Sequence, residues 1–264
     1  MNNNIIFVNE INFLINDFLK TINKEDIQIY FPNNEINSST NFNDFIIKEI
    51  TNEQKEFLKD NIDYSMKCLK KLDSSLLNQN TDLEYDLWKL CIFDNMFFNL
   101  PFTLQDIIFI PISYIKSSMN NTSLLNFFFK DNINKRFSKT LIHEKIHLLQ
   151  RYNEKIWDEY IIKNTNWIIS NRELVKNYSL YGNNKIIFNP DTFYVKSKFI
   201  YNDNNNYYYG QMLLNSKKEI SNIWCSIKER DNIFNLYPDL KYSKKYEHPY
   251  EELAYSMSDE LHNN

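Results

Sequence analysis

The sequence predicts an α+β fold that is mostly helical and carries one small, mainly antiparallel sheet. Apolar residues recur three and four positions apart in much of residues 11–99 and 121–178, as on one face of a helix. After Gly182, short runs rich in Ile, Phe and Tyr are separated by turns rich in Asn and Asp, which is typical of strands. We therefore expect a mostly helical N-terminal region over residues 1–100, followed or continued by a domain over residues 101–264.

In the first part of the chain, apolar periodicity predicts helices over residues 11–22, 52–77 and 82–99. Pro101 ends the last of these patterns. Residues 106–115 are apolar and β-branched, which predicts a strand. Pro111 favours an edge position for this strand, because proline cannot donate to the hydrogen-bond ladder of a sheet.

In the second part, the same periodicity predicts helices over residues 121–130, 137–152 and 154–178. Strands are expected over residues 185–188, 193–201 and 207–214, the last two joined by an Asn- and Asp-rich turn. A short helix is expected over residues 249–261, with Pro249 in its first turn because proline is well tolerated there.

The composition excludes several function classes. The chain of 264 residues has two isolated glycines, so a glycine-rich phosphate-binding loop is excluded. The formal net charge of −4 argues against a nucleic-acid partner, which a basic excess would indicate. We also expect no membrane partner, because no apolar run is long enough to span a bilayer. The lack of a secretory signal and the three scattered cysteines predict an intracellular, cytoplasmic protein.

One motif carries chemistry: His143-Glu144-Lys145-Ile146-His147, an H-E-x-x-H match. Residues four apart lie one above the other on a helix, so both imidazoles can bind one metal ion. Glu144 lies beside His143, close enough to take a proton from a metal-bound water. Polar and apolar residues fall on separate sides of this segment, so it predicts an amphipathic helix. The competing interpretation is a helix whose two histidines and glutamate merely face solvent.

Residues 140–149, Thr-Leu-Ile-His-Glu-Lys-Ile-His-Leu-Leu, resemble the active-site helix of the zincin metallopeptidases. The resemblance implies a zincin-like fold, a catalytic Zn²⁺ and hydrolysis of a peptide or protein substrate, with Glu144 as general base. Lys145 departs from the uncharged residue of that family, but it points about 200° around the helix from His143, so it can be exposed there without touching the metal. The flanking segments resemble uncharacterised metallopeptidases of large DNA viruses, which would place the protein in the host cytoplasm or the virion.

The resemblance also implies a third zinc ligand. Gln150 and Asn153 exclude the metzincin continuation, which has Gly and His at these positions. The gluzincin branch takes a glutamate from a second helix, in a Glu-x-x-Ala signature, and residues 251–254 are the match in this chain. Glu251 is therefore the expected ligand. Glu252, His248 and Glu173, in this order, are the next candidates.

Two further expectations come from the same family. Its members stabilise the oxyanion with a Tyr or His near the third ligand, and Tyr255 is our catalytic candidate, with Tyr250 and His248 also open. An edge strand usually binds the substrate peptide, and residues 106–115 are the counterpart unless they form a plain core strand. Two competing functions stay open: a catalytically inactive zincin-fold binding or virion protein, and a helical interaction module without metal.

Overall fold

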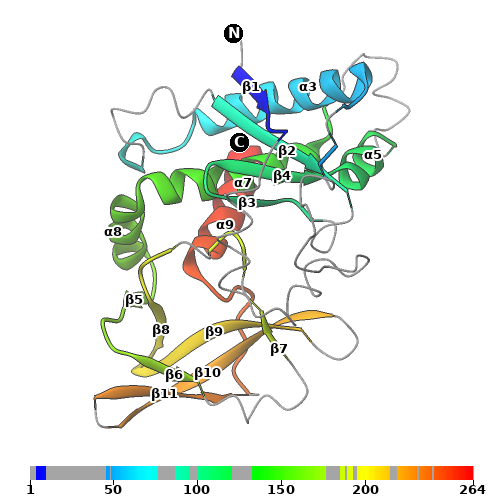
Figure 1. Cartoon of the computed structure of the whole chain (residues 1–264). Coiled ribbons are helices and arrows are strands. Elements are labelled where there is room, and N and C mark those ends of the chain that lie inside the picture. Colours follow the sequence, from blue (N-terminus) through cyan, green and yellow to red (C-terminus); the bar gives the residue numbers. More distant parts are fainter. Residues whose placement is uncertain are drawn as a thin grey trace. The chain divides into compact units, whose positions relative to one another are not determined.

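The computed structural model in Figure 1 describes residues 4–9, 46–47, 49–76, 87–94, 100–120, 133–176, 185–187, 189–192, 195–214, 219–230, 232–239 and 241–263. The helices expected over residues 11–22 and 121–130 lie outside the described residues. Contacts divide the chain into two compact units, one of residues 1–149 and 257–264 and the other of residues 150–256.

The first unit contains a four-stranded sheet with the order β1-β2-β4-β3. Its strands are β1 (Asn4–Phe7), β2 (Leu87–Phe93), β3 (Phe102–Leu104) and β4 (Ile107–Pro111). β1, β2 and β4 are parallel, and β3 pairs antiparallel with β4. The expected edge position of the strand around Pro111 is therefore wrong, because β4 pairs on both sides. Pro111 is its last residue, and helix α5 (Ile112–Asn120) begins directly after it.

The strand β2 falls where the sequence predicted a helix over residues 82–99. Its residues Leu90, Cys91, Ile92 and Phe93 are all buried, and β2 has a partner strand on each side. A strand buried on both faces reads as a continuous apolar run, which periodicity alone does not distinguish from a buried helix. The helical prediction was wrong for this reason.

Helix α3 (Asn52–Leu69) confirms most of the helix expected over residues 52–77, and a short 3-10 helix η2 (Ser74–Leu76) follows. Helix α7 (Lys135–Tyr152) confirms the helix that carries the H-E-x-x-H motif. Asn134 caps α7 by accepting a hydrogen bond from the Phe137 N–H at 2.9 Å. The buried Asn61 of α3 accepts hydrogen bonds from Asn134 N–H and Ser138 Oγ, which fixes the start of α7 against α3.

Lys145 of α7 is buried, with a relative exposure of 1%, so the expectation of an exposed side chain is wrong. Its Nζ donates a hydrogen bond to the Leu87 carbonyl oxygen at 2.8 Å and lies 5.2 Å from the centre of the Trp88 ring. The aliphatic stem covers apolar surface while the charge is compensated by a carbonyl dipole and an aromatic face. Lys145 thereby joins the motif helix to β2.

The second unit contains a seven-stranded sheet with the order β5-β8-β9-β10-β11-β6, in which β7 also pairs with β9 (Figure 1). All its pairs are antiparallel except β6 with β11. Its strands are β5 (Trp167–Ile169), β6 (Leu174–Lys176), β7 (Lys185–Ile187), β8 (Phe199–Asp203), β9 (Asn206–Leu214), β10 (Ile220–Arg230) and β11 (Ile233–Pro238).

The hairpin between β8 and β9 confirms the predicted Asn-rich turn. Asn204 and Asn205 have φ angles of 50° and 70°, and Asp203 pairs with Asn206 across the turn. A two-residue turn with two positive φ angles matches the twist of the flanking strands, and Asn tolerates this conformation well. By contrast, the helix expected over residues 154–178 is only partly present, since α8 (Glu154–Asn164) ends before β5.

The final helix, α9 (Pro249–Asn263), confirms the one expected over residues 249–261. The described residues thus form an α+β fold with five α-helices and two sheets. The predicted mostly helical, zincin-like architecture with one small antiparallel sheet is wrong, because the seven-stranded sheet is large and the four-stranded sheet is mainly parallel. No helix in the described part of the chain combines the length and apolarity needed to cross a membrane.

Candidate metal centre

His143 and His147 lie one helical turn apart on α7. Their Nε2 atoms are 3.0 Å apart and their rings are nearly perpendicular, at 85°. Two nitrogen ligands of a tetrahedral zinc ion, each about 2.0–2.1 Å from the metal, lie about 3.3 Å apart. The two imidazoles therefore face each other at close to the separation that one shared metal ion requires. His147 is fully buried and His143 almost so, at relative exposures of 0% and 7%.

Glu251 is the third member of this group. It lies in the first turn of α9, and its relative exposure is 5%. One ligand atom from each of His143, His147 and Glu251 lies within 4.8 Å of the other two, so this buried group could hold a metal ion. The structure brings together the three residues that the sequence predicted as ligands. Glu144, the predicted base, is also buried in α7.

The Glu251 carboxylate is oriented by Asn189, which the sequence did not point to. Asn189 Nδ2 donates hydrogen bonds to Glu251 Oε1 and to Glu247 Oε1, each at 2.8 Å. Asn189 Oδ1 accepts a hydrogen bond from the Asp191 N–H at 2.9 Å, which turns the amide nitrogen toward the two carboxylates. Burial and the charge of Glu251 raise the pKa of Glu247 to about 7. Asn189 gave no sequence signal, because the chain is rich in Asn throughout.

The start of α9 is held by hydrogen bonds to two other helices. Gln150, which follows His147 on α7 by about one turn, donates from Nε2 to the Tyr250 carbonyl oxygen at 3.1 Å. The Tyr250 hydroxyl donates to Asp158 Oδ1 of α8 at 2.8 Å. Burial raises the pKa of Tyr250, and burial also raises the pKa of Asp158. These bonds fix the helical phase that sets the direction of Glu251.

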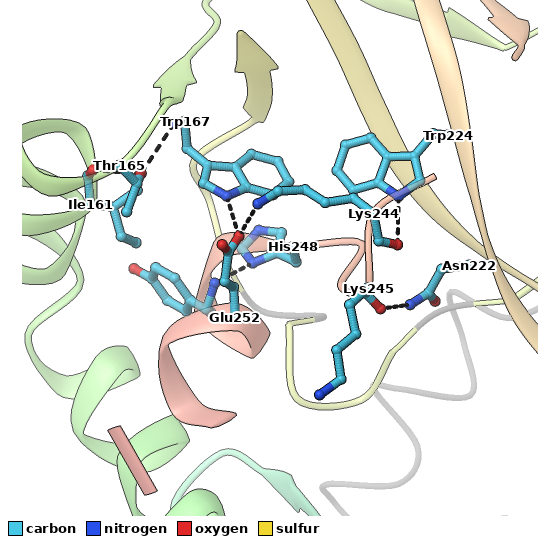
Figure 2. A network of polar contacts seen from close by, with 10 residues as sticks. Ile161, Thr165, Trp167, Asn222, Trp224, Lys244, Lys245, His248 and Glu252 are labelled. Atoms are coloured by element: carbon cyan, nitrogen blue, oxygen red, sulfur yellow. Dashed lines mark hydrogen bonds and ion pairs between the residues drawn. The ribbon is translucent and has the colours of Figure 1, made fainter. Parts of the chain in front are cut away.

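Glu252, the second candidate for the third ligand, has a different set of partners (Figure 2). Its Oε2 atom accepts a hydrogen bond from Trp167 Nε1 at 2.8 Å and forms an ion pair with Lys244 Nζ. The Lys244 Nζ also lies over the Trp167 and Tyr201 rings, 5.1 and 4.1 Å from their centres. Glu252 therefore anchors the first turn of α9 to the sheet of the second unit, and it is not a member of the ligand group.

His248 and Glu173 also lie outside the ligand group. His248 Nδ1 accepts a hydrogen bond from the Tyr250 N–H at 3.2 Å, and its ring contacts the Phe199 ring edge-on. Figure 2 shows His248 beside Glu252. Glu173 is exposed just before β6, in the second unit. The structure thus favours Glu251 over each of the other candidates.

Tyr255, the predicted catalytic tyrosine, lies on α9 one turn after Glu251. Its side chain is 40% exposed and stacks on Tyr246 with ring centres 4.9 Å apart. Its catalytic role stays a prediction.

Comparisons with known proteins found no matching family model, no matching curated protein and no matching solved structure. Function is therefore inferred from the residues and their geometry.

Proposed function

We propose that the protein is a zinc-dependent peptidase, in which His143, His147 and Glu251 hold Zn²⁺ and Glu144 is the general base. One observation carries the proposal. Three side chains from two helices far apart in the sequence bring ligand atoms within 4.8 Å of one another in a buried place. Two imidazoles and one carboxylate are a ligand set of catalytic zinc sites in hydrolases, and such sites keep a position open for water.

The burial of these groups supports a cation in their midst. A bound cation stabilises buried carboxylates, and Glu144 and Glu251 are both buried here. When bound, zinc would acidify a water molecule and polarise the peptide carbonyl. Glu144 would accept the proton of that water as its oxygen bonds to the carbonyl carbon. The same carboxyl would then donate the proton to the amine nitrogen as the C–N bond breaks.

The first experiment measures the metal itself. Wild-type protein purified without chelators should contain about one zinc ion per chain by elemental analysis, and His147→Ala should lose most of it. Glu159→Gln changes an exposed glutamate of α8 and serves as the control that keeps its zinc. Wild-type protein that holds no zinc and gains none on titration would overturn the proposal.

The second experiment measures hydrolysis. Glu144→Gln should keep its zinc, because Gln occupies the same volume and Glu144 is not a ligand, but it should lose cleavage of a peptide library followed by mass spectrometry. Hydrolysis retained in Glu144→Gln would remove Glu144 as the base. Zinc binding without cleavage of any peptide by the wild type would instead indicate a catalytically inactive binding protein.

A further inference from the structure

The second unit contains a cavity of about 90 Å³ beside Asn189 and Glu247. A single water molecule needs about 10–15 Å³ by the same measure, so the cavity accommodates a group of several heavy atoms. It lies between strands β7 and β9 and the segment that precedes α9. The lining residues are Ile186, Ile187, Asn189, Thr192, Tyr209, Gly210, Gln211, Met212, Glu247 and His248.

The described lining of the cavity combines apolar side chains with one acidic residue. Ile187 and Met212 supply aliphatic surface, and among the described lining residues Glu247 is the acidic one and none is Lys or Arg. His248 Nδ1 accepts a hydrogen bond from the Tyr250 N–H in this arrangement. The Glu247 carboxyl is therefore the group of the described lining that most favours a cationic ligand.

Gly210 allows two backbone segments to approach closely at the wall of this cavity. A Cβ atom at this position would lie 2.3 Å from the Glu247 carbonyl oxygen, well inside van der Waals contact. The glycine thus allows β9 to lie directly against the backbone of Glu247, and it holds this residue at the cavity. Any other residue would displace one of the two backbones.

The side chain of Asn189 links Glu247 of the cavity to Glu251, the proposed metal ligand. Asn189 Nδ2 is 2.8 Å from Oε1 of both Glu247 and Glu251, so these two oxygens are at most 5.6 Å apart. In a peptide, the α-ammonium nitrogen lies about 2.5 Å from the carbonyl carbon of its own residue. A peptide whose α-ammonium group binds Glu247 can therefore extend its first peptide bond toward Glu251. A lysine ammonium would hold its peptide bond farther away, at the other end of a four-carbon stem.

We propose that this cavity binds the N-terminal residue of a peptide, that Glu247 accepts hydrogen bonds from its α-ammonium group, and that the protein is accordingly an aminopeptidase. The inference rests on the proposed peptidase function. The aliphatic lining binds the side chain of the first residue. The hydrogen bonds to Glu247 require that this residue has a free α-amine.

Binding is tested first, with the zinc-loaded Glu144→Gln protein so that the peptide stays intact. Isothermal titration calorimetry should show that a peptide beginning with Leu binds about 10- to 100-fold more tightly than its N-acetylated form, as a lost charge-assisted hydrogen bond implies. Adding Glu247→Gln should remove this difference, and adding Glu159→Gln should preserve it. Equal binding of the two peptides, or tight binding of an N-acetylated peptide that begins with Lys, would overturn the inference. This comparison of peptides does not depend on the folding of the Glu247 variant.

Cleavage is tested next, with the zinc-loaded wild type and the same peptides. Mass spectrometry should show release of the first residue from the free peptide and no cleavage of the acetylated one. Internal cleavage of both peptides would overturn the aminopeptidase inference and leave the peptidase proposal standing. Loaded protein that cleaves neither these peptides nor any library peptide would contradict the peptidase proposal itself.

Discussion

Asn189 orients the carboxylate of Glu251, the candidate third metal ligand. Its amide hydrogen-bonds to both Glu247 and Glu251, and its own orientation is fixed by the Asp191 N–H. Residues that hydrogen-bond to metal ligands orient them and tune their affinity for the metal. A single uncharged side chain therefore keeps the carboxylates of Glu247 and Glu251 in a defined arrangement.

We expect Asn189→Ala to weaken zinc binding about 10- to 100-fold, because the Glu251 carboxylate loses the hydrogen bond that orients it. The dissociation constant is measured by competition with a chromogenic chelator. Asn222→Ala is the matched control, since the bond described for Asn222 Nδ2 goes to the Lys245 carbonyl oxygen and not to either carboxylate. An unchanged affinity in Asn189→Ala would show that Glu251 needs no such support.

Tyr255 can be tested separately from metal binding. If its hydroxyl stabilises the oxyanion, Tyr255→Phe should lower kcat about 100-fold while the zinc content stays at the wild-type level. The ring stacking on Tyr246 is kept by Phe, so stability should change little. Peptide turnover is the measurement, and Tyr246→Phe is the control. A normal kcat would remove Tyr255 from the catalytic residues.

The residues of the candidate site were predictable where their roles follow from local spacing. His143, Glu144 and His147 form one motif on one helix, and Glu251 belongs to a four-residue signature behind a helix-starting proline. Asn189 was not predictable, because its role depends on partners that are distant along the chain. The burial of Lys145 was missed for the same reason, since its partners lie on β2.

At the scale of elements, α7 is held in the first unit by α3 and β2. The contact to β2 depends on Lys145, whose Nζ donates to the Leu87 carbonyl oxygen. We expect Lys145→Met to lower the free energy of unfolding by about 1–3 kcal/mol, because the aliphatic volume is kept but a buried carbonyl loses its donor. Urea denaturation measures the change. Lys155→Met, at an exposed position of α8, should change it by less than about 0.5 kcal/mol. A Lys145→Met protein as stable as the wild type would contradict this role.

The elements were predictable where the pattern is local. The amphipathic pattern of α7, Pro249 at the start of α9 and the Asn-rich turn between β8 and β9 each depend on neighbouring residues. β2 was mistaken for a helix because its parallel partners, β1 and β4, come from distant segments. β10 was not predicted, because its buried positions do not alternate regularly with exposed ones. Its pairing with β9 and β11 makes it a strand.

A bound metal should stabilise the folded protein as a whole. A ligand that binds only the folded state contributes about 2.7 kcal/mol when its free concentration is 100 times its dissociation constant. We therefore expect added zinc to raise the Tm of the metal-free protein by several degrees in a calorimetric scan. The gain should shrink as the pH falls toward 5, because imidazole ligands must lose their protons to bind metal. His147→Ala is the control and should show no rise in Tm when zinc is added. A wild-type Tm that does not change with added zinc would contradict a specific metal site.

The boundary between the two units falls inside α7 and again inside α9. Each unit therefore takes part of both helices, and the chain offers no loop at these two points where it could be divided. A gene fragment that encodes residues 150–256 alone would begin in the last turn of α7 and end in the middle of α9. Truncation often yields independently folding pieces of larger chains. In this chain it would separate His143 and His147 from Glu251. Neither unit alone contains all three candidate ligands, so metal binding has to be assayed on a chain that contains both units.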